Sequence, residues 1–197
     1  MFVVLDCGHS KKTAGKYSPK LKDGSRFYEY KYNRILGTMI GERLTELGID
    51  WCFSYDIEED TDLALSSRAK MANDKSKIYG AGNVVLISIH HNALGDGTKF
   101  IDAKGFIAFT TKGVTNSDKW AAAFTESAKE VLKPLGRKVR KPQEADFTVI
   151  YKTVCPSVLL EYGFYSDEEE VYWLMSEEGL QANCELTIKA IQKMIEE

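Results

Sequence analysis

The sequence of 197 residues contains no long hydrophobic run. A membrane-spanning helix needs roughly 20 consecutive apolar residues, and apolar stretches here, such as VVLISI at 84–89, are far shorter. The first ten residues, MFVVLDCGHS, lack the positively charged start and the extended apolar segment of a secretory signal peptide. We therefore expect no membrane span, and synthesis in the cytoplasm without a signal peptide.

Cysteine is scarce and scattered. The four cysteines are far apart and form no CxxC pair: Cys7, Cys52, Cys155 and Cys184. Zinc knuckles and disulfide frameworks depend on closely and regularly spaced cysteines, so neither is expected. The pattern predicts free, partly buried thiols.

An excess of basic residues is also missing. Lys and Arg number 26 against 29 Asp and Glu, which gives a net charge of −3, and no block of Lys and Arg dominates. Nucleic-acid-binding proteins usually carry a concentrated basic surface. The balance argues against a nucleic-acid partner and against electrostatic docking on an anionic membrane or cell wall.

What the sequence does contain is typical of a globular domain. Hydrophobic residues make up 44% and charged residues 28%. A chain of this length buries about two-thirds of its surface on folding, so it needs no metal to hold its fold. A bound metal would therefore be expected to serve chemistry. No repeat or linker interrupts the chain, and residues 1–197 are expected to form a single domain.

Short apolar segments alternate with segments of helical periodicity. Strands are expected at 2–6, 51–55, 83–90, 105–110, 147–151 and 157–162. Helices are expected to begin near Glu29, Thr61, Asn116, Ser166 and residue 177. This alternation predicts an α/β sandwich, with a mostly parallel sheet of about six strands and helices on both faces.

All three histidines follow or end predicted strands. His9 comes just after the first strand, and His90 and His91 end the strand at 83–90. In an open α/β sheet, sites form outside the carboxyl ends of the strands, so these imidazoles are expected at one edge. Successive strand residues face opposite sides, which leaves at most one of His90 and His91 as a ligand.

A zinc site of this kind needs a third protein ligand. Catalytic zinc accepts histidine nitrogen and carboxylate oxygen and keeps one position for water. Glu29, at the start of the first helix, lies near the same edge and is the best candidate. Each residue also has an ordinary explanation. A histidine beside a glycine is often a loop residue, and a first-turn glutamate favours the helix dipole, so spacing alone leaves both readings open.

Glu161 is a second unusual residue, since it closes the apolar run SVLLEY. A carboxylate in this position is costly unless it is exposed, paired or used in chemistry. It is expected at the same edge as His9 and His90, where it could act as general base and then general acid. Pairing with a lysine, or capping the helix that follows Ser166, would explain it equally well.

These residues together resemble the zinc-dependent N-acetylmuramoyl-L-alanine amidases of the type-3 amidase family, which includes bacterial autolysins and phage endolysins. The resemblance covers nearly the whole chain. Its motifs are VVLDCGHS with His9, EYKYN with Glu29, LSSRAKMAN, SIHHN with His90, and PSVLLEYGFYSDEEE with Glu161. The resemblance implies that His9, Glu29 and His90 bind one Zn²⁺ and that Glu161 is the catalytic glutamate.

The chain departs from the family pattern at three places. Cys7 stands where many members have proline, and it is not expected to bind the metal. His91 replaces a common small residue, and it is interpreted with Asn92 as a substrate-binding residue at the rim of the site. The segment after Gly15 lacks the usual glycine-rich form, which leaves its substrate contacts open.

The resemblance implies hydrolysis of the amide bond between N-acetylmuramic acid and L-alanine in peptidoglycan. Residues 1–197 are then one catalytic amidase domain with no evident wall-binding module, and no protein partner is inferred. A zinc peptidase that cuts within the stem peptide would use the same metal chemistry. A non-catalytic wall-binding domain is a further alternative, against which the full set of four site residues argues.

The expected cellular role follows from the absence of a signal peptide. The enzyme is expected to act on the cell wall after release from the cytoplasm, as in lysis by a phage or prophage endolysin. A host autolysin released by another route is the alternative.

Overall fold

A central six-stranded sheet organises the chain, whose computed structural model describes residues 1–196. The strands are β1 (Phe2–Cys7), β2 (Asp50–Phe53), β3 (Val84–Asn92), β4 (Ile107–Thr110), β5 (Gln143–Glu144) and β6 (Ser157–Phe164), in the spatial order β2-β1-β3-β6-β4-β5. Strands β2, β1, β3 and β6 are parallel, and β4 pairs antiparallel with β6. The expected α/β fold with a mostly parallel sheet is confirmed.

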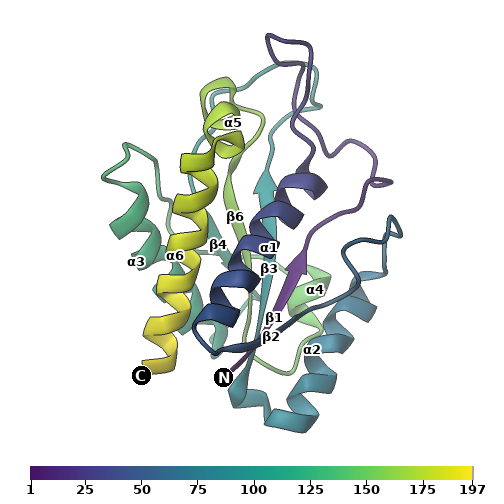
Figure 1. Ribbon diagram of the computed structural model, residues 1–197, viewed down its shortest axis with the longest axis vertical. Coiled ribbons are helices and arrows are strands. Elements are labelled where there is room, and N and C mark those ends of the chain that lie inside the picture. The colour runs from purple at the N-terminus through teal and green to yellow at the C-terminus, as the bar shows by residue number, and fades with distance from the viewer. Residues whose placement is uncertain (197) are drawn as a thin grey trace.

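Helices cover both faces of this sheet (Figure 1). They are α1 (Glu29–Glu46), α2 (Leu65–Tyr79), α3 (Ser117–Leu132), α4 (Thr148–Tyr151), α5 (Glu168–Met175) and α6 (Glu177–Glu196). Helices α1, α3 and α6 pack on one face, while α2 and α4 pack on the other. Among the residues described, no helix has the length and apolar character needed to span a membrane.

The alternation of side chains along the central strands produces a separate core on each face. Val3, Leu5 and Cys7 of β1 join the core beneath α1, α3 and α6. Phe2 and Val4 of the same strand join the core beneath α2 and α4. Because both faces are covered, the central strands are apolar throughout, which explains their nearly continuous hydrophobic runs.

The same alternation decides where the two adjacent histidines of β3 point. His91 continues the series of Val85, Ile87 and Ile89 towards the α1 face. His90 therefore points to the α2 face. In the pairing of β3 with β6, His90 lies directly opposite Glu161. The backbone of two neighbouring parallel strands thus places these side chains on one face, one strand spacing apart.

The expected strand at 147–151 is wrong, because Thr148–Tyr151 forms the one-turn helix α4. Val149 and Ile150 are both buried in the core beneath α2 and α4. Adjacent residues of a strand would point to opposite faces, so burial of both on one side requires a helical turn. A short apolar run does not distinguish the two structures by periodicity. The sixth strand is the two-residue β5 instead.

A buried carboxyl group fixes the end of β6, just beyond Glu161. Glu170 of α5 accepts hydrogen bonds from the backbone N–H groups of Phe164, at 2.7 Å, and Gly105, at 3.0 Å. Burial raises the pKa of Glu170 from its ordinary value of 4.5 to about 7, although these hydrogen bonds oppose the shift. The carboxyl group therefore holds its proton more tightly in the folded chain than in the unfolded one.

This carboxyl group predicts a specific pH dependence of stability. Because the folded state has the higher pKa, the free energy of unfolding should fall as pH rises from about 4.5 to about 7, by up to about 3 kcal/mol, and its contribution should then level off. Urea unfolding across this range measures the slope. Glu170→Gln should flatten the curve, and an unchanged slope in that variant would contradict the assignment.

Candidate functional site

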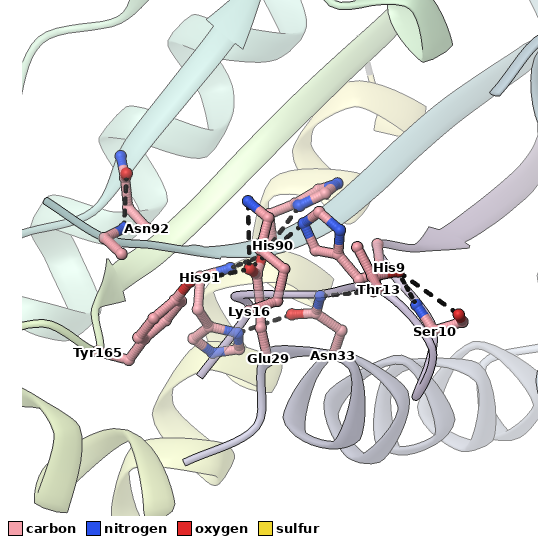
Figure 2. Close-up of polar contacts among 12 residues, drawn as sticks. His9, Ser10, Thr13, Lys16, Glu29, Asn33, His90, His91, Asn92 and Tyr165 are labelled. Carbon is pink, nitrogen blue, oxygen red and sulfur yellow. Dashed lines mark hydrogen bonds and ion pairs between the residues drawn. The ribbon is translucent and has the colours of Figure 1, made fainter. Parts of the chain in front are cut away.

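Three side chains from three parts of the chain meet at the carboxyl end of the sheet. His9 follows β1, His90 lies near the end of β3, and Glu29 is the first residue of α1. One potential ligand atom from each lies within 4.8 Å of the others. In Figure 2, dashed lines join the carboxylate of Glu29 to the imidazoles of His9 and His90, which lie next to each other. The sequence-based grouping of these residues is thus reproduced in space.

The backbone at His9 adopts a conformation that few side-chain-bearing residues take. Its φ angle is 64°, and it is the one non-glycine residue with positive φ within 1–196. The carbonyl groups around it are held by side chains: Tyr55 and Arg68 donate to Cys7, at 2.7 and 2.8 Å, and Asn33 donates to Gly8, at 2.9 Å. Such strain persists only when its surroundings enforce it, and it often marks functional sites.

The carboxylate of Glu29 is buried but well supplied with donors. Its oxygens lie 3.0 Å from Nδ1 of His90 and 3.3 Å from Nε2 of His9, and one accepts the backbone N–H of His91 at 3.2 Å. Burial opposes ionisation, yet the contacts with His9 and His90 outweigh it and hold the pKa of Glu29 well below its ordinary value. The site therefore contains a fixed negative charge in contact with two imidazoles.

Gly8 provides the space for the imidazole of His90. A Cβ atom at Gly8 would lie 2.1 Å from Cε1 and 2.4 Å from Nε2 of that ring. Since no pair of carbon atoms tolerates such a separation, any other residue here would displace His90. The glycine in the sequence GHS is therefore explained by packing against the second histidine.

Replacing Gly8 by alanine should disturb metal binding through His90 alone. We expect zinc affinity to fall roughly 10–100-fold, as on loss of a group that orients a ligand, and stability to fall by about 1–3 kcal/mol from overpacking. Gly82→Ala is the matched control, since its Cβ would meet nothing within 4 Å. Zinc titration and thermal unfolding measure both effects. Parent-like affinity in Gly8→Ala would show that the ring does not need this space.

A pocket of about 420 Å³ opens beside these three residues. Its lining includes Gly8, His9, Lys16, Asp62, Leu65, Arg68, His90, Asp146, Phe147, Thr148, Val149, Leu159 and Glu161. His9, His90 and Glu161 thus face one cavity, formed between the end of the sheet, α2 and α4. It is large enough to admit part of a peptide or sugar.

Glu161 contributes a carboxyl group with unusual properties to this pocket. Its Oε2 atom is buried and has no hydrogen-bond partner among the described residues. Burial raises the pKa of Glu161 to about 8, the charge of His90 opposes the shift, and the negative charge of Glu29 adds to it. A carboxyl group with this proton affinity is suited to accept and return a proton near neutral pH.

His91 and Asn92 do not lie where a substrate-binding role requires, which corrects that expectation. His91 is 2% exposed, packs on Phe27, and its Nδ1 atom lies 2.8 Å from Oδ1 of Asn33. Burial lowers its pKa to about 4, so it is a neutral core residue. Asn92 accepts the backbone N–H of Ala93 and lies apart from the His9–Glu29–His90 group in Figure 2. Neither residue lines the pocket.

Cys7 is likewise excluded as a ligand by its direction. It is fully buried on the α1 face, where its Sγ atom closely approaches Gly37 of α1. Burial raises the pKa of this thiol far above its ordinary value, so a thiolate is disfavoured. The four cysteines are all free, as the spacing predicted.

Three residues of the site were not singled out from the sequence. Asn33 supports both Gly8 and His91, and its position four residues after Glu29 places it on the same helix face, which was an available signal. The hydroxyl of Tyr165 donates to Glu29 at 3.4 Å. Lys16 lies 3.9 Å from Glu29 and lines the pocket. Tyr165 lies in the motif that contains Glu161, but its contact with Glu29 was not predicted, and Lys16 lies in a loop that periodicity does not describe.

The family model described as N-acetylmuramoyl-L-alanine amidase matches residues 3–193, nearly the whole chain. The chain belongs to this amidase family. No curated protein sequence matches the amidase.

Several solved structures described as amidases are similar to this chain. An N-acetylmuramoyl-L-alanine amidase from Clostridium difficile 630 is 23% identical, with a TM-score of 0.82 and coverage of 99% of this chain and 96% of that one. AmiC2 of Nostoc punctiforme is 22% identical, with a TM-score of 0.81 and coverage of 100% and 98%. The CwlD amidase from Clostridioides difficile, solved in complex with the GerS lipoprotein, is 22% identical, with a TM-score of 0.78 and coverage of 99% and 98%.

Family membership establishes the reaction class of the amidase. It is a hydrolase that acts on peptidoglycan amide bonds, as the resemblance of its motifs predicted. At these identities the solved structures support the shared fold. The roles of individual residues rest on the geometry described above.

Proposed function

We propose that the amidase cleaves the bond between N-acetylmuramic acid and L-alanine with one zinc ion held by His9, Glu29 and His90. The observation that carries the proposal is the convergence of these three side chains, whose ligand atoms lie within 4.8 Å of one another, beside the pocket that His9, His90 and Glu161 line. Two imidazole nitrogens and one carboxylate oxygen form a donor set typical of catalytic zinc, with a position left for water.

The residues present fit such an ion. Glu29 supplies the negative charge that a divalent cation requires, and its burial fixes that charge in place. The backbone N–H of His91 and the hydroxyl of Tyr165 orient the carboxylate, as outer partners of metal ligands commonly do. When bound, a zinc ion polarises the scissile carbonyl and makes water a stronger acid.

Glu161 is proposed to move the proton in this reaction. It faces the pocket beside His90, and its free Oε2 atom can accept the proton of the attacking water. The same carboxyl group then returns a proton to the departing amine of L-alanine. One residue can perform both steps because water attack and amine departure occur at the same carbonyl carbon.

Digestion of purified sacculi tests the proposed bond. Mass spectrometry of the products should find free L-alanine amino termini and muramic acid with a free lactyl carboxylate. Chelation should abolish release, and added zinc should restore it. New termini within the stem peptide would indicate a peptidase, and sedimentation with sacculi without soluble products would indicate a wall-binding domain. Full activity after metal removal would overturn the zinc proposal.

The cellular role is a separate proposal, namely that the amidase lyses the wall after release from the cytoplasm. The lack of a dominant basic block is consistent with catalysis that does not depend on strong wall affinity. Production in a bacterium with and without a membrane lesion should give lysis only when the lesion is present. Lysis without a lesion would contradict this route.

A further inference from the structure

Among the described residues that line the pocket, the side chains with permanent positive charge are Arg68 and Lys16. Arg68 is buried, and its guanidinium group is already hydrogen-bonded within the protein. Its Nε donates to Leu63, Nη1 to the carbonyl of Cys7, and Nη2 to Asp62, at 2.8–3.1 Å. The charge of Arg68 is also balanced by Asp6, which lies 3.5 Å away. Arg68 therefore supports the site and does not offer a donor to a ligand.

Lys16 is held in place by its backbone while its ammonium group remains available. The carbonyl of Lys16 accepts the backbone N–H of Glu29 at 3.0 Å. Three residues earlier, the hydroxyl of Thr13 donates to Asp62 at 2.7 Å, which attaches this loop beside α2. The side chain is 41% exposed, and its Nζ lies 3.9 Å from Glu29, beyond hydrogen-bond distance. Figure 2 shows Lys16 over the Glu29 and His90 side chains.

Glu161 also lines the pocket and feels the charge of Lys16, but no ion pair joins the two residues; the other acidic groups have partners of their own. Asp62 is bonded by Thr13 and Arg68, and Asp146 lies 3.2 Å from the ammonium of Lys112. Glu29 is satisfied by its histidine, backbone and tyrosine contacts. A metal ion bound to Glu29 would also weaken the attraction of Lys16 to that carboxylate. The lysine is thus suited to bind an anionic group that arrives with the substrate.

We propose that Lys16 is a substrate-positioning residue that binds a carboxylate of the stem peptide during amide hydrolysis. This inference rests on the proposed function. The carboxyl group of the muramic lactyl unit is consumed in the scissile amide, and N-acetylated sugars are neutral. Every carboxylate near the bond therefore belongs to the peptide. Lys16 makes the enzyme selective for stem peptides that carry a free carboxylate close to L-alanine.

Two synthetic muramoyl-L-alanyl peptides test this selectivity. They differ only in whether the residue after L-alanine carries a free carboxylate or a carboxamide. For the parent enzyme we expect KM to be about 10-fold lower with the carboxylate, the effect of one hydrogen bond to a charged group, with kcat nearly equal. Lys16→Met should raise KM about 10-fold for the carboxylate peptide alone, and Lys16→Arg should restore much of the difference. Lys20→Met, an exposed lysine of the same loop outside the pocket, is the matched control.

A binding measurement separates this inference from the proposed reaction. The dissociation constants of both peptides are measured by calorimetry in the Glu161→Gln background, with and without Lys16→Met. If Lys16→Met weakens binding of the carboxylate peptide alone, the role of Lys16 is supported. This holds even if the parent enzyme hydrolyses neither peptide, because failed hydrolysis would overturn only the proposed function. The role of Lys16 would be overturned if Lys16→Met weakened binding of both peptides equally or of neither. A fall in kcat of this variant without a change in KM would also overturn it.

Discussion

Glu161→Gln is expected to retain zinc and to lose roughly 10²–10⁴-fold in kcat, the usual contribution of a positioned acid or base. The amide preserves the size of the side chain but cannot accept the proton of water or return one to the amine. The fold should be undisturbed, because Oε2 of Glu161 makes no hydrogen bond within the described chain. Metal analysis, thermal unfolding and product release by the purified variant measure these three properties.

The zinc content and the kinetic parameters of this variant distinguish the possible roles of Glu161. A decrease in kcat with nearly constant KM and full zinc content supports proton transfer. Loss of zinc together with activity would indicate that Glu161 belongs to the metal site instead. If the variant digests sacculi at near the parent rate, another residue must handle the proton and the assignment is wrong.

His9→Ala is expected to abolish both stoichiometric zinc and activity. It removes one of three ligands, so the loss in zinc affinity should exceed the roughly 10–100-fold that follows loss of an outer hydrogen-bond partner. Residual activity should fall at least as far as in Glu161→Gln, since the remaining carboxylate and imidazole no longer form a complete site. Metal content after dialysis and sacculus digestion at added zinc concentrations measure both losses.

The comparison between these two variants tests the site as a whole. Both variants are expected to lose activity, but only His9→Ala is expected to lose zinc. His91→Asn is a further control, because His91 is a neighbouring histidine that lies in the core and does not face the pocket. If His91→Asn lost zinc while remaining folded and His9→Ala did not, the proposed ligand set would be wrong.

Much of the fold follows from the periodicity of the sequence. The strands ending near His9 and at His90, and the helix beginning at Glu29, were predicted within a few residues. The segment at 147–151 was not, because a short apolar run suits a strand or a buried helical turn equally well. In the structure, the backbone hydrogen bond from Tyr151 to Phe147, at 2.8 Å, and the joint burial of Val149 and Ile150 identify the helical turn.

The site was predictable to the extent that it depends on strand ends. Placement of His9, His90 and Glu161 at carboxyl ends of parallel strands brings them to one edge, and alternation separates His90 from His91. Loops follow no such rule. The approach of Lys16 depends on the path of residues 10–28, which periodicity does not describe. A substrate-binding role was predicted for His91 and Asn92 because they follow the proposed ligand His90 in sequence, although His91 is buried beneath α1.

The direct pairing of His90 with Glu161 has a consequence for how this enzyme can diversify. Their separation is set by main-chain hydrogen bonds between β3 and β6, which do not depend on the identity of the surrounding side chains. Lys16, in contrast, is carried by a loop whose length and composition can change without altering that pairing. With the roles proposed for these residues, the hydrolytic machinery and the choice of substrate are encoded in separable parts of the chain, so selection can alter peptide preference while the chemical step stays intact.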